Sequence, residues 1–283
     1  MKRQCKNSGF GAQSSPISQI NISDVYFSTV IRILLIGSGN LAYRLSGALE
    51  QSKGVRLVGL RARDPEKLSG FPGAAPRSGL DEPAPDADIC LLAVADRAIG
   101  DVAAGLKGSP ALVVHCSGAQ PLATLKGTSR HGVFYPLQTF SRDREVSLAG
   151  IPVLTEAGRP EDLALLNKLA NTMGCSPQPA NSDKRLALHL AAVFVNNFTN
   201  HMVYLGESVA SGSGLDKDLF RPLLRETLAK LESLGPREAQ TGPARRGDTA
   251  TLAKHRELLR GKPAAAIYDQ ITESIISTYE TEL

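Results

Sequence analysis

The stretch Ile31-Arg-Ile-Leu-Leu-Ile36, followed directly by Gly37-Ser-Gly-Asn-Leu-Ala42, decides the fold of this chain. The first segment is apolar except for Arg32, which predicts a strand that is buried on both faces. After the glycines, leucine recurs at every fourth position, which predicts an amphipathic helix. A glycine-containing turn therefore connects a buried strand to a helix.

The spacing of the two glycines indicates the chemistry of this turn. Gly37 permits a tight bend, and Gly39 lets the backbone approach a pyrophosphate group without an intervening Cβ. Ala42 stands at the third position of the pattern, where a small residue lets the helix pack closely on the strand. The free N–H groups of the helix would face the anion, although an ordinary strand–helix turn could also use glycine for positive φ. The expected dinucleotide-binding residues of the turn are Gly37, Ser38, Gly39, Asn40 and Leu41.

The end of the second expected strand, at 55–60, indicates which dinucleotide binds. NAD-binding proteins usually place Asp or Glu there to bind the ribose, whereas this strand runs into Arg61 and Arg63 with no acid before Asp64. Two arginines can bind a 2′-phosphate through charge-assisted hydrogen bonds. We therefore expect NADP as the cofactor, with NAD as the alternative. The arginines could instead be solvated surface residues, and Asp64 could cap a short helix that begins with Pro65.

Strands and helices alternate up to about residue 180. Further strands are expected at 88–94, 111–114, 132–135 and 151–154, the last at a sheet edge where its proline is tolerated. Helices are expected at 98–106 and 162–173, and only helices follow, at 184–210, at 216–234 and in two final segments. The fold class is therefore an α/β domain with a mostly parallel, doubly wound sheet, followed by an all-α domain. The expected division is 1–30 as a disordered leader, 31–180 as a dinucleotide-binding domain and 181–283 as a helical substrate-binding and dimerisation domain.

Composition and charge exclude several classes of protein. The net charge of +4, from 32 basic and 28 acidic residues, is too small to indicate nucleic-acid binding. No uninterrupted apolar stretch is long enough to cross a membrane, and the four cysteines show neither disulfide nor zinc spacing. We expect a cytoplasmic protein without a metal. Apolar residues of the C-terminal helices, such as Ile267, Ile271 and Ile275, exceed what one thin helical layer can bury and predict a homodimer.

Six motifs, in order along the chain, carry a family resemblance. They are Gly37-Ser-Gly-Asn-Leu-Ala42, Leu92-Ala-Val-Ala-Asp96, His115-Cys-Ser-Gly118, Tyr135-Pro-Leu-Gln-Thr-Phe140, His189-Leu-Ala-Ala-Val-Phe-Val-Asn-Asn-Phe198 and Thr241-Gly-Pro-Ala-Arg-Arg-Gly-Asp248. Over residues 31–280 the chain resembles an uncharacterised family with a Rossmann-like N-terminal domain and a C-terminal domain of unknown function. That family is similar to pyrroline-5-carboxylate reductase and to the 3-hydroxyacid and 6-phosphogluconate dehydrogenases.

The resemblance implies where each end of the cofactor lies. The adenosine and diphosphate would lie beside Ala93, Val94, Ala95 and Asp96, and the nicotinamide near Cys116, Ser117 and Gly118. Two departures from the relatives bear on the chemistry. Tyr135 stands where relatives often have His. Val193 stands four residues before Asn197, where the 3-hydroxyacid dehydrogenases place the Lys that donates the proton.

The helix expected at 184–210 carries the candidate catalytic groups. His189, Asn196 and Asn200 share one helical face, and Asn197 lies beside it. Histidine exchanges protons near neutral pH, so His189 is the candidate proton donor, with the Asn residues orienting substrate or carboxamide. These polar groups could instead join helices or subunits, and Arg246 could clamp a substrate carboxylate or pair with Asp248. The catalytic set is His189, Asn197 and Ser117, and the substrate-binding set is Tyr135, Gln138, Asn196, Asn200 and Arg246.

Together these residues predict an NADP-dependent oxidoreductase. It would transfer a hydride to or from a small carbonyl, hydroxyl or imine compound in the cleft between the two domains. The alternative is a non-catalytic NADP-binding sensor or scaffold that has lost the catalytic Lys of its dehydrogenase relatives.

Overall fold

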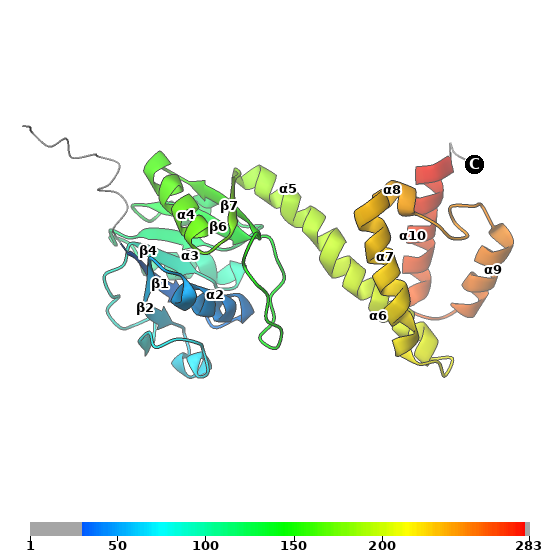
Figure 1. Cartoon of the computed structure of the whole chain (residues 1–283), viewed down its shortest axis with the longest axis horizontal. Coiled ribbons are helices and arrows are strands. Elements are labelled where there is room, and N and C mark those ends of the chain that lie inside the picture. Colours follow the sequence, from blue (N-terminus) through cyan, green and yellow to red (C-terminus); the bar gives the residue numbers. More distant parts are fainter. Residues whose placement is uncertain (1–29, 281–283) are drawn as a thin grey trace, which may run out of the picture. The chain divides into compact units, whose positions relative to one another are not determined.

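The computed structural model describes residues 30–280, so the leader expected at 1–30 lies outside the described residues except for Val30. A β-sheet forms the core of the N-terminal part (Figure 1). It has eight strands in the order β3-β2-β1-β4-β5-β6-β7-β8. The strands are β1 (Ile31–Ile36), β2 (Val55–Arg61), β3 (Arg77–Ser78), β4 (Ile89–Leu92), β5 (Leu112–His115), β6 (His131–Pro136), β7 (Pro152–Ala157) and β8 (Ser176–Pro179).

Both faces of the sheet are buried, as the continuous apolar strands predict. On β1, Ile33 and Leu35 face one core with α2 (Asn40–Gln51) and α4 (Pro160–Thr172), whereas Leu34 and Ile36 face a second core with α3 (Ile99–Ala104). Figure 1 shows these helices against the sheet. Side chains alternate along a strand, so one apolar run supplies both cores.

The winding of the sheet reverses between β1 and β4. From β1 the chain proceeds through β2 and β3 in one direction, and from β4 it proceeds through β5 and β6 in the other. These six strands are mutually parallel, so their carboxyl ends lie along one edge. In open α/β sheets, ligands bind outside the carboxyl ends at this reversal. The doubly wound α/β class expected from the sequence is confirmed.

One expected strand lies in a different place from the one predicted. The strand expected at 151–154 on a sheet edge is β7, which pairs antiparallel with β6 and parallel with β8 and is therefore interior. The edge is β8, whose sequence Ser-Pro-Gln-Pro was not recognised as a strand. Proline lacks the N–H that a ladder needs and is tolerated at an edge, so the edge position explains both prolines of β8.

The chain divides into two compact units between Ala191 and Ala192. The sequence-based boundary at 180/181 falls just before α5 (Ser182–Ala192) and stays a prediction. A π-helical segment (Val193–Phe198) and α6 (Thr199–Ser211) follow α5 without a break. The helix expected at 184–210 is thus continuous. It differs from the expectation in that its middle segment has the wider turns of a π-helix.

The second unit consists of helices within the described residues. After α6 these are α7 (Phe220–Leu234), α8 (Pro236–Ala239), α9 (Thr249–Leu258) and α10 (Ala264–Tyr279). Asp248 caps α9 by accepting from Thr251 N at 3.0 Å, and Tyr279 donates from its hydroxyl to the carbonyl of Arg237 at 2.9 Å. An apolar cavity of about 360 Å³ lies among α6, α9 and α10. Among residues 30–280, no helix combines the length and apolar character needed to span a membrane.

Candidate functional site

The turn after β1 lies at the reversal point of the sheet. Gly37 has a φ of +145°, which side-chain-bearing residues rarely adopt. A Cβ at Gly37 would collide with the carbonyl oxygen of Ala93 and lie 2.7 Å from its carbonyl carbon. Ala93 directly follows β4, the strand beside β1. Glycine is therefore required here because two strand ends approach each other closely.

The N-terminus of α2 is open toward the same space. Gly39 is the N-cap and no side chain caps the helix, so the first N–H groups of α2 have no intrahelical acceptor. A Cβ at Gly39 would meet nothing within 4 Å. Two hydrogen bonds hold the turn. Arg142 donates to the carbonyl of Ser38 at 2.7 Å, and Asn40 donates to the carbonyl of Phe140 at 3.2 Å. This fixed, open turn fits a phosphate group.

A cleft of about 680 Å³ extends from this turn along the ends of β2 and β4. Three cationic side chains line it, Arg63, Lys67 and Arg97. Asp64 also lines it, but its carboxylate accepts from Glu66 N at 3.3 Å and lies 3.5 Å from Lys67 Nζ. The cap expected of Asp64 is confirmed. Of the expected cofactor residues, the cleft brings together Gly37, Ser38, Gly39, Asn40, Leu41, Arg63, Ala93, Val94 and Ala95.

Arg61 departs from its expected role at the ribose. It still belongs to β2, paired with Ile36, and its side chain is buried. Its guanidinium donates to Ser78 Oγ at 3.1 Å and to the carbonyl of Glu82, and it does not line the cleft. The strand pleat fixes its direction, whereas Arg63 follows the strand and is exposed. Asp96 is likewise outside the cleft lining.

A second group of expected site residues meets farther along the same sheet edge. The hydroxyl of Tyr135, on β6, lies 3.1 Å from Nδ1 of His189, on α5. Gly118, which follows β5, lies close to both rings. A Cβ at Gly118 would be 2.7 Å from His189 Nδ1 and 2.8 Å from Tyr135 Cζ. Both ring side chains are half-buried. Burial, and then the charge of Asp96, raise the pKa of Tyr135, so its hydroxyl stays protonated.

The turn between β5 and Gly118 is shaped by Ser117. Its hydroxyl accepts from the backbone N–H of Ala119 at 3.1 Å and of Gln120 at 2.9 Å. The backbone N–H of Ser117 in turn donates to His115 Nδ1 at 3.2 Å. Burial raises the pKa of the neighbouring Cys116 thiol and favours its protonated form. The structure thus gives Ser117 a turn-forming contact, and its catalytic role stays a prediction.

The remaining expected site residues are exposed, and four of them belong to the second unit. Asn196, Asn197 and Asn200 belong to the second unit and are exposed, as is Arg246. Gln138, in the first unit, is exposed and accepts from Thr139 N at 2.8 Å through its own side chain. No group of three or more His, Cys, Asp or Glu residues within 30–280 could hold a metal ion.

The structure adds residues at the cleft that the sequence did not indicate. Lys67 and Arg97 follow the ends of β2 and β4, so their positions after buried strands were an available signal. Arg142 had no such signal, because it stands about a hundred residues after the turn that it supports.

A doubly wound sheet with a glycine turn at its reversal point defines the Rossmann class of fold. Residues 151–275 match the family described as "Domain of unknown function (DUF2520)". A Bacteroides fragilis protein described as a "putative NADP oxidoreductase" is 38% identical to this chain, with a TM-score of 0.80 over 87% of this chain and 98% of that one. The chain therefore belongs to the family of that protein. No curated protein matches it.

Two more distant solved structures share the fold. An imine reductase of Streptomyces aurantiacus is 11% identical, with a TM-score of 0.61 over 86% of this chain and 93% of that one. A pyrroline carboxylate reductase of Plasmodium falciparum with NADP bound is 12% identical, with a TM-score of 0.55 over 87% and 99%. The expected resemblance, a Rossmann-like domain followed by a helical one, is confirmed.

Proposed function

We propose that the protein is an NADP-dependent oxidoreductase acting on a small carbonyl, hydroxyl or imine compound. The observation that carries this proposal is the contact of Gly118, Tyr135 and His189 at the sheet edge that also holds the Gly37 turn. Ile36, Leu92 and His115 pair across β1, β4 and β5, so the two groups follow neighbouring parallel strands. The B. fragilis relative, described as an NADP oxidoreductase, supports the same class.

The cofactor would lie along this edge. The open turn and the uncapped N-terminus of α2 would hold the diphosphate. Val94 and Ala95 would flank the adenosine, and Arg63 with Lys67 would bind the 2′-phosphate. Bound NADP would supply or accept the hydride of the reaction. Cys116, Ser117 and Gly118 stay the candidates for the nicotinamide end.

The proton would come from the Tyr135–His189 pair. When His189 is protonated, its Nδ1–H donates to the Tyr135 oxygen, and the second ring proton sits on Nε2. His189 is half-buried and therefore reachable by a small substrate. The protonated ring can give its Nε2 proton to a carbonyl oxygen or an imine nitrogen and is left as the neutral imidazole, which the adjacent hydroxyl holds in place. Asn196, Asn197, Asn200, Gln138 and Arg246 stay candidates for the substrate side.

Consumption of NADPH with a panel of cyclic imines and 2-oxo acids tests this function. The proposal expects saturable turnover of at least one class. Tight NADP binding without turnover of any member would instead favour the sensor or scaffold function.

The first prediction concerns cofactor choice. NADP should bind at least about tenfold more tightly than NAD, because each charge-assisted phosphate bond contributes roughly 1.5–3 kcal/mol. Calorimetric titration measures both affinities. Replacing Arg63 and Lys67 together with Ala should weaken NADP and leave NAD unchanged. Arg56→Ala is the control, since Arg56 is an exposed β2 arginine outside the cleft lining. Equal affinities in the wild-type protein would contradict the prediction.

The second prediction is a homodimer formed through the helical unit. Helix α7 exposes an apolar stripe in the single chain, with Leu228 59% and Leu231 40% exposed. A stable dimer would cover such a surface with an interface of about 2,000 Å² or more. Light scattering should show a dimer at micromolar concentration, and Leu228→Glu with Leu231→Glu should give monomer. Ser233→Glu places the same charge on the opposite side of α7 and should leave the dimer intact. A monomeric wild-type protein would contradict this assembly.

We also place the protein in a reducing compartment, the cytoplasm. Cys90, Cys116 and Cys175 are free and buried, and thiols persist where glutathione and thioredoxin keep them reduced.

A further inference from the structure

Arg185 is a charged side chain buried in the first unit with only 1% of its surface exposed. It lies on α5, one helical turn before His189. Its guanidinium forms an ion pair with Glu156 of β7, donates to the carbonyl of Gln120 at 2.6 Å, and donates to Ser182 Oγ at 3.3 Å. A charge held so deeply persists only with such partners, because removing one leaves the other uncompensated.

The partners of Arg185 come together through strand register. His115 on β5 pairs with Val133 on β6, and Val133 pairs with Glu156 on β7. Directly paired residues face the same side of a sheet. The side chains of His115, Val133 and Glu156 therefore project from the same face. Tyr135 lies two residues along β6 and projects on that side too. The pairing of His115, Val133 and Glu156 therefore places Glu156 on the same face of the sheet as Tyr135.

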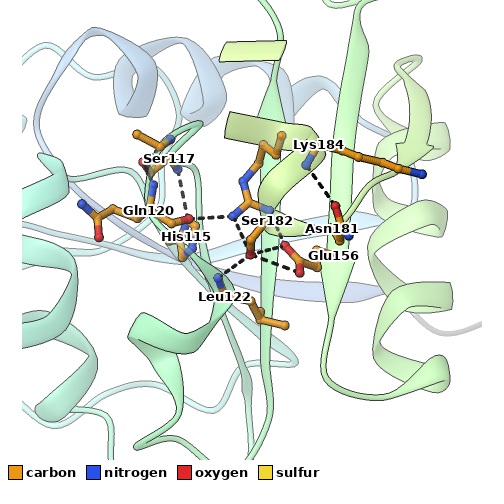
Figure 2. A network of polar contacts seen from close by, with 10 residues as sticks. His115, Ser117, Gln120, Leu122, Glu156, Asn181, Ser182 and Lys184 are labelled. Atoms are coloured by element: carbon orange, nitrogen blue, oxygen red, sulfur yellow. Dashed lines mark hydrogen bonds and ion pairs between the residues drawn. The ribbon is translucent and has the colours of Figure 1, made fainter. Parts of the chain in front are cut away.

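The same network also holds the turn that follows β5 (Figure 2). Ser117 Oγ accepts from Gln120 N, and the carbonyl of Gln120 receives the Arg185 hydrogen bond. Ser182 Oγ donates to the carboxylate of Glu156, 3.0 Å from Oε2, and accepts from Leu122 N at 3.0 Å. The turn, β7 and the first turn of α5 are thereby joined around one guanidinium.

The start of α5 is fixed as well. Asn181 accepts from Lys184 N through Oδ1 at 3.0 Å, which caps the helix. Burial, and then the charge of Arg185, lower the pKa of His115 to about 4. His115 is therefore neutral at physiological pH and adds no second cation beside Arg185.

We propose that Arg185, through Glu156 and the carbonyl of Gln120, sets the contact of His189 with Tyr135 and Gly118. Arg185 is a positioning residue, because its guanidinium contacts Glu156, Ser182 and the turn after β5. Its hydrogen bond to Gln120 holds the turn that carries Gly118, and its ion pair with Glu156 holds the helix that carries His189. A 1 Å displacement of a catalytic group can lower a rate by about 10²-fold, so the lock matters for turnover. The catalytic consequence rests on the proposed function, whereas the geometric one does not.

The test compares Arg185→Met with Arg130→Met in the full chain. Arg130 pairs with Asp162, which is fully buried, and donates to it from Nε at 2.9 Å. This pair lies in the same unit, between the start of β6 and α4, and includes none of Gly118, Tyr135 or His189. Both variants should lower Tm, so Tm alone does not separate a positioning role from a stabilising one.

The deciding measurement is nuclear magnetic resonance of the histidine rings without any ligand. The chain contains five histidines, and His189→Gln identifies the His189 signals. Arg185→Met should abolish the nuclear Overhauser contact between the His189 and Tyr135 rings, and Arg130→Met should keep it. If Arg185→Met does not fold, Glu156→Gln replaces it, since the amide keeps the shape and loses the charge.

Kinetics provide the second measurement. Arg185→Lys keeps the charge but not the forked geometry, so kcat should fall about tenfold or more while KM for NADPH stays unchanged. An unchanged ring contact in both Arg185→Met and Glu156→Gln, with a Tm loss like that of Arg130→Met, would overturn the positioning role. A wild-type protein without turnover would end the proposed function, and the ring contact would still decide the geometric inference.

Discussion

Replacing His189 with alanine should lower turnover by about 10²–10⁴-fold, the range expected for removing a general acid. NADP affinity should stay nearly unchanged, because His189 does not line the cleft at the glycine turn. The loss should appear in kcat and in kcat/KM equally, since proton donation acts only in the transition state. Steady-state kinetics and calorimetric titration of NADP on the same preparation measure both quantities.

Two variants control for indirect effects of this substitution. His131→Ala removes another partly buried histidine of the same unit, at the start of β6 and away from the pair, and should leave kcat unchanged. Tyr135→Phe keeps the ring but removes the hydroxyl that meets His189 Nδ1, and should lower kcat less than His189→Ala does. If His189→Ala lowers Tm while kcat per folded molecule survives, His189 joins elements of the fold and the proton comes from elsewhere.

Much of the fold could be predicted because its signals are local. The apolar run of β1, the glycines after it and the leucines of α2 are contiguous in sequence, and each matches one element of the structure. The helix expected at 162–173 is α4, and Gly174 after it has the positive φ of a helix C-terminus. The strands and helices expected from periodicity and turn residues are therefore present in the structure, with small shifts at the ends of each element.

Where prediction failed, the deciding contact is not local. Only the pairing of β2 with β1 distinguishes Arg61, which is buried, from Arg63, which is exposed. The place of β7 depends on β8, a strand whose prolines hide it from any propensity argument. The polar residues expected along one helix belong to two units, and their shared site stays a prediction.

The candidate site shows the same contrast. The glycine turn could be named from sequence because its residues are neighbours. Arg185 could not, although it is among the largest fully buried side chains of the described residues. On a helix pattern an arginine four residues before a histidine indicates a solvated face. Only the register of β5, β6 and β7 brings Glu156 within reach and explains its burial.

The glycine turn yields the other large effect, through a matched pair of substitutions. Gly37→Ala should destabilise the first unit by about 3 kcal/mol or more, a value typical of a severely strained backbone position. The new Cβ would meet the Ala93 carbonyl, which is backbone held by the sheet and cannot swing away as a side chain would. Tm should fall by roughly 6–12 °C for a domain of this size, as measured by circular dichroism.

Gly39→Ala separates the fold from the cofactor at the same turn. A Cβ at Gly39 meets no atom within 4 Å and the residue has no positive φ, so Tm should change little. In a dinucleotide site the second glycine admits the pyrophosphate, so the same methyl group would occupy the space of the phosphate. NADP affinity should fall by tenfold or more, equivalent to about 1.4 kcal/mol, in calorimetric titration. If Gly39→Ala binds NADP as tightly as the wild-type protein, the glycines serve only the turn, and the cofactor proposal for this cleft is wrong.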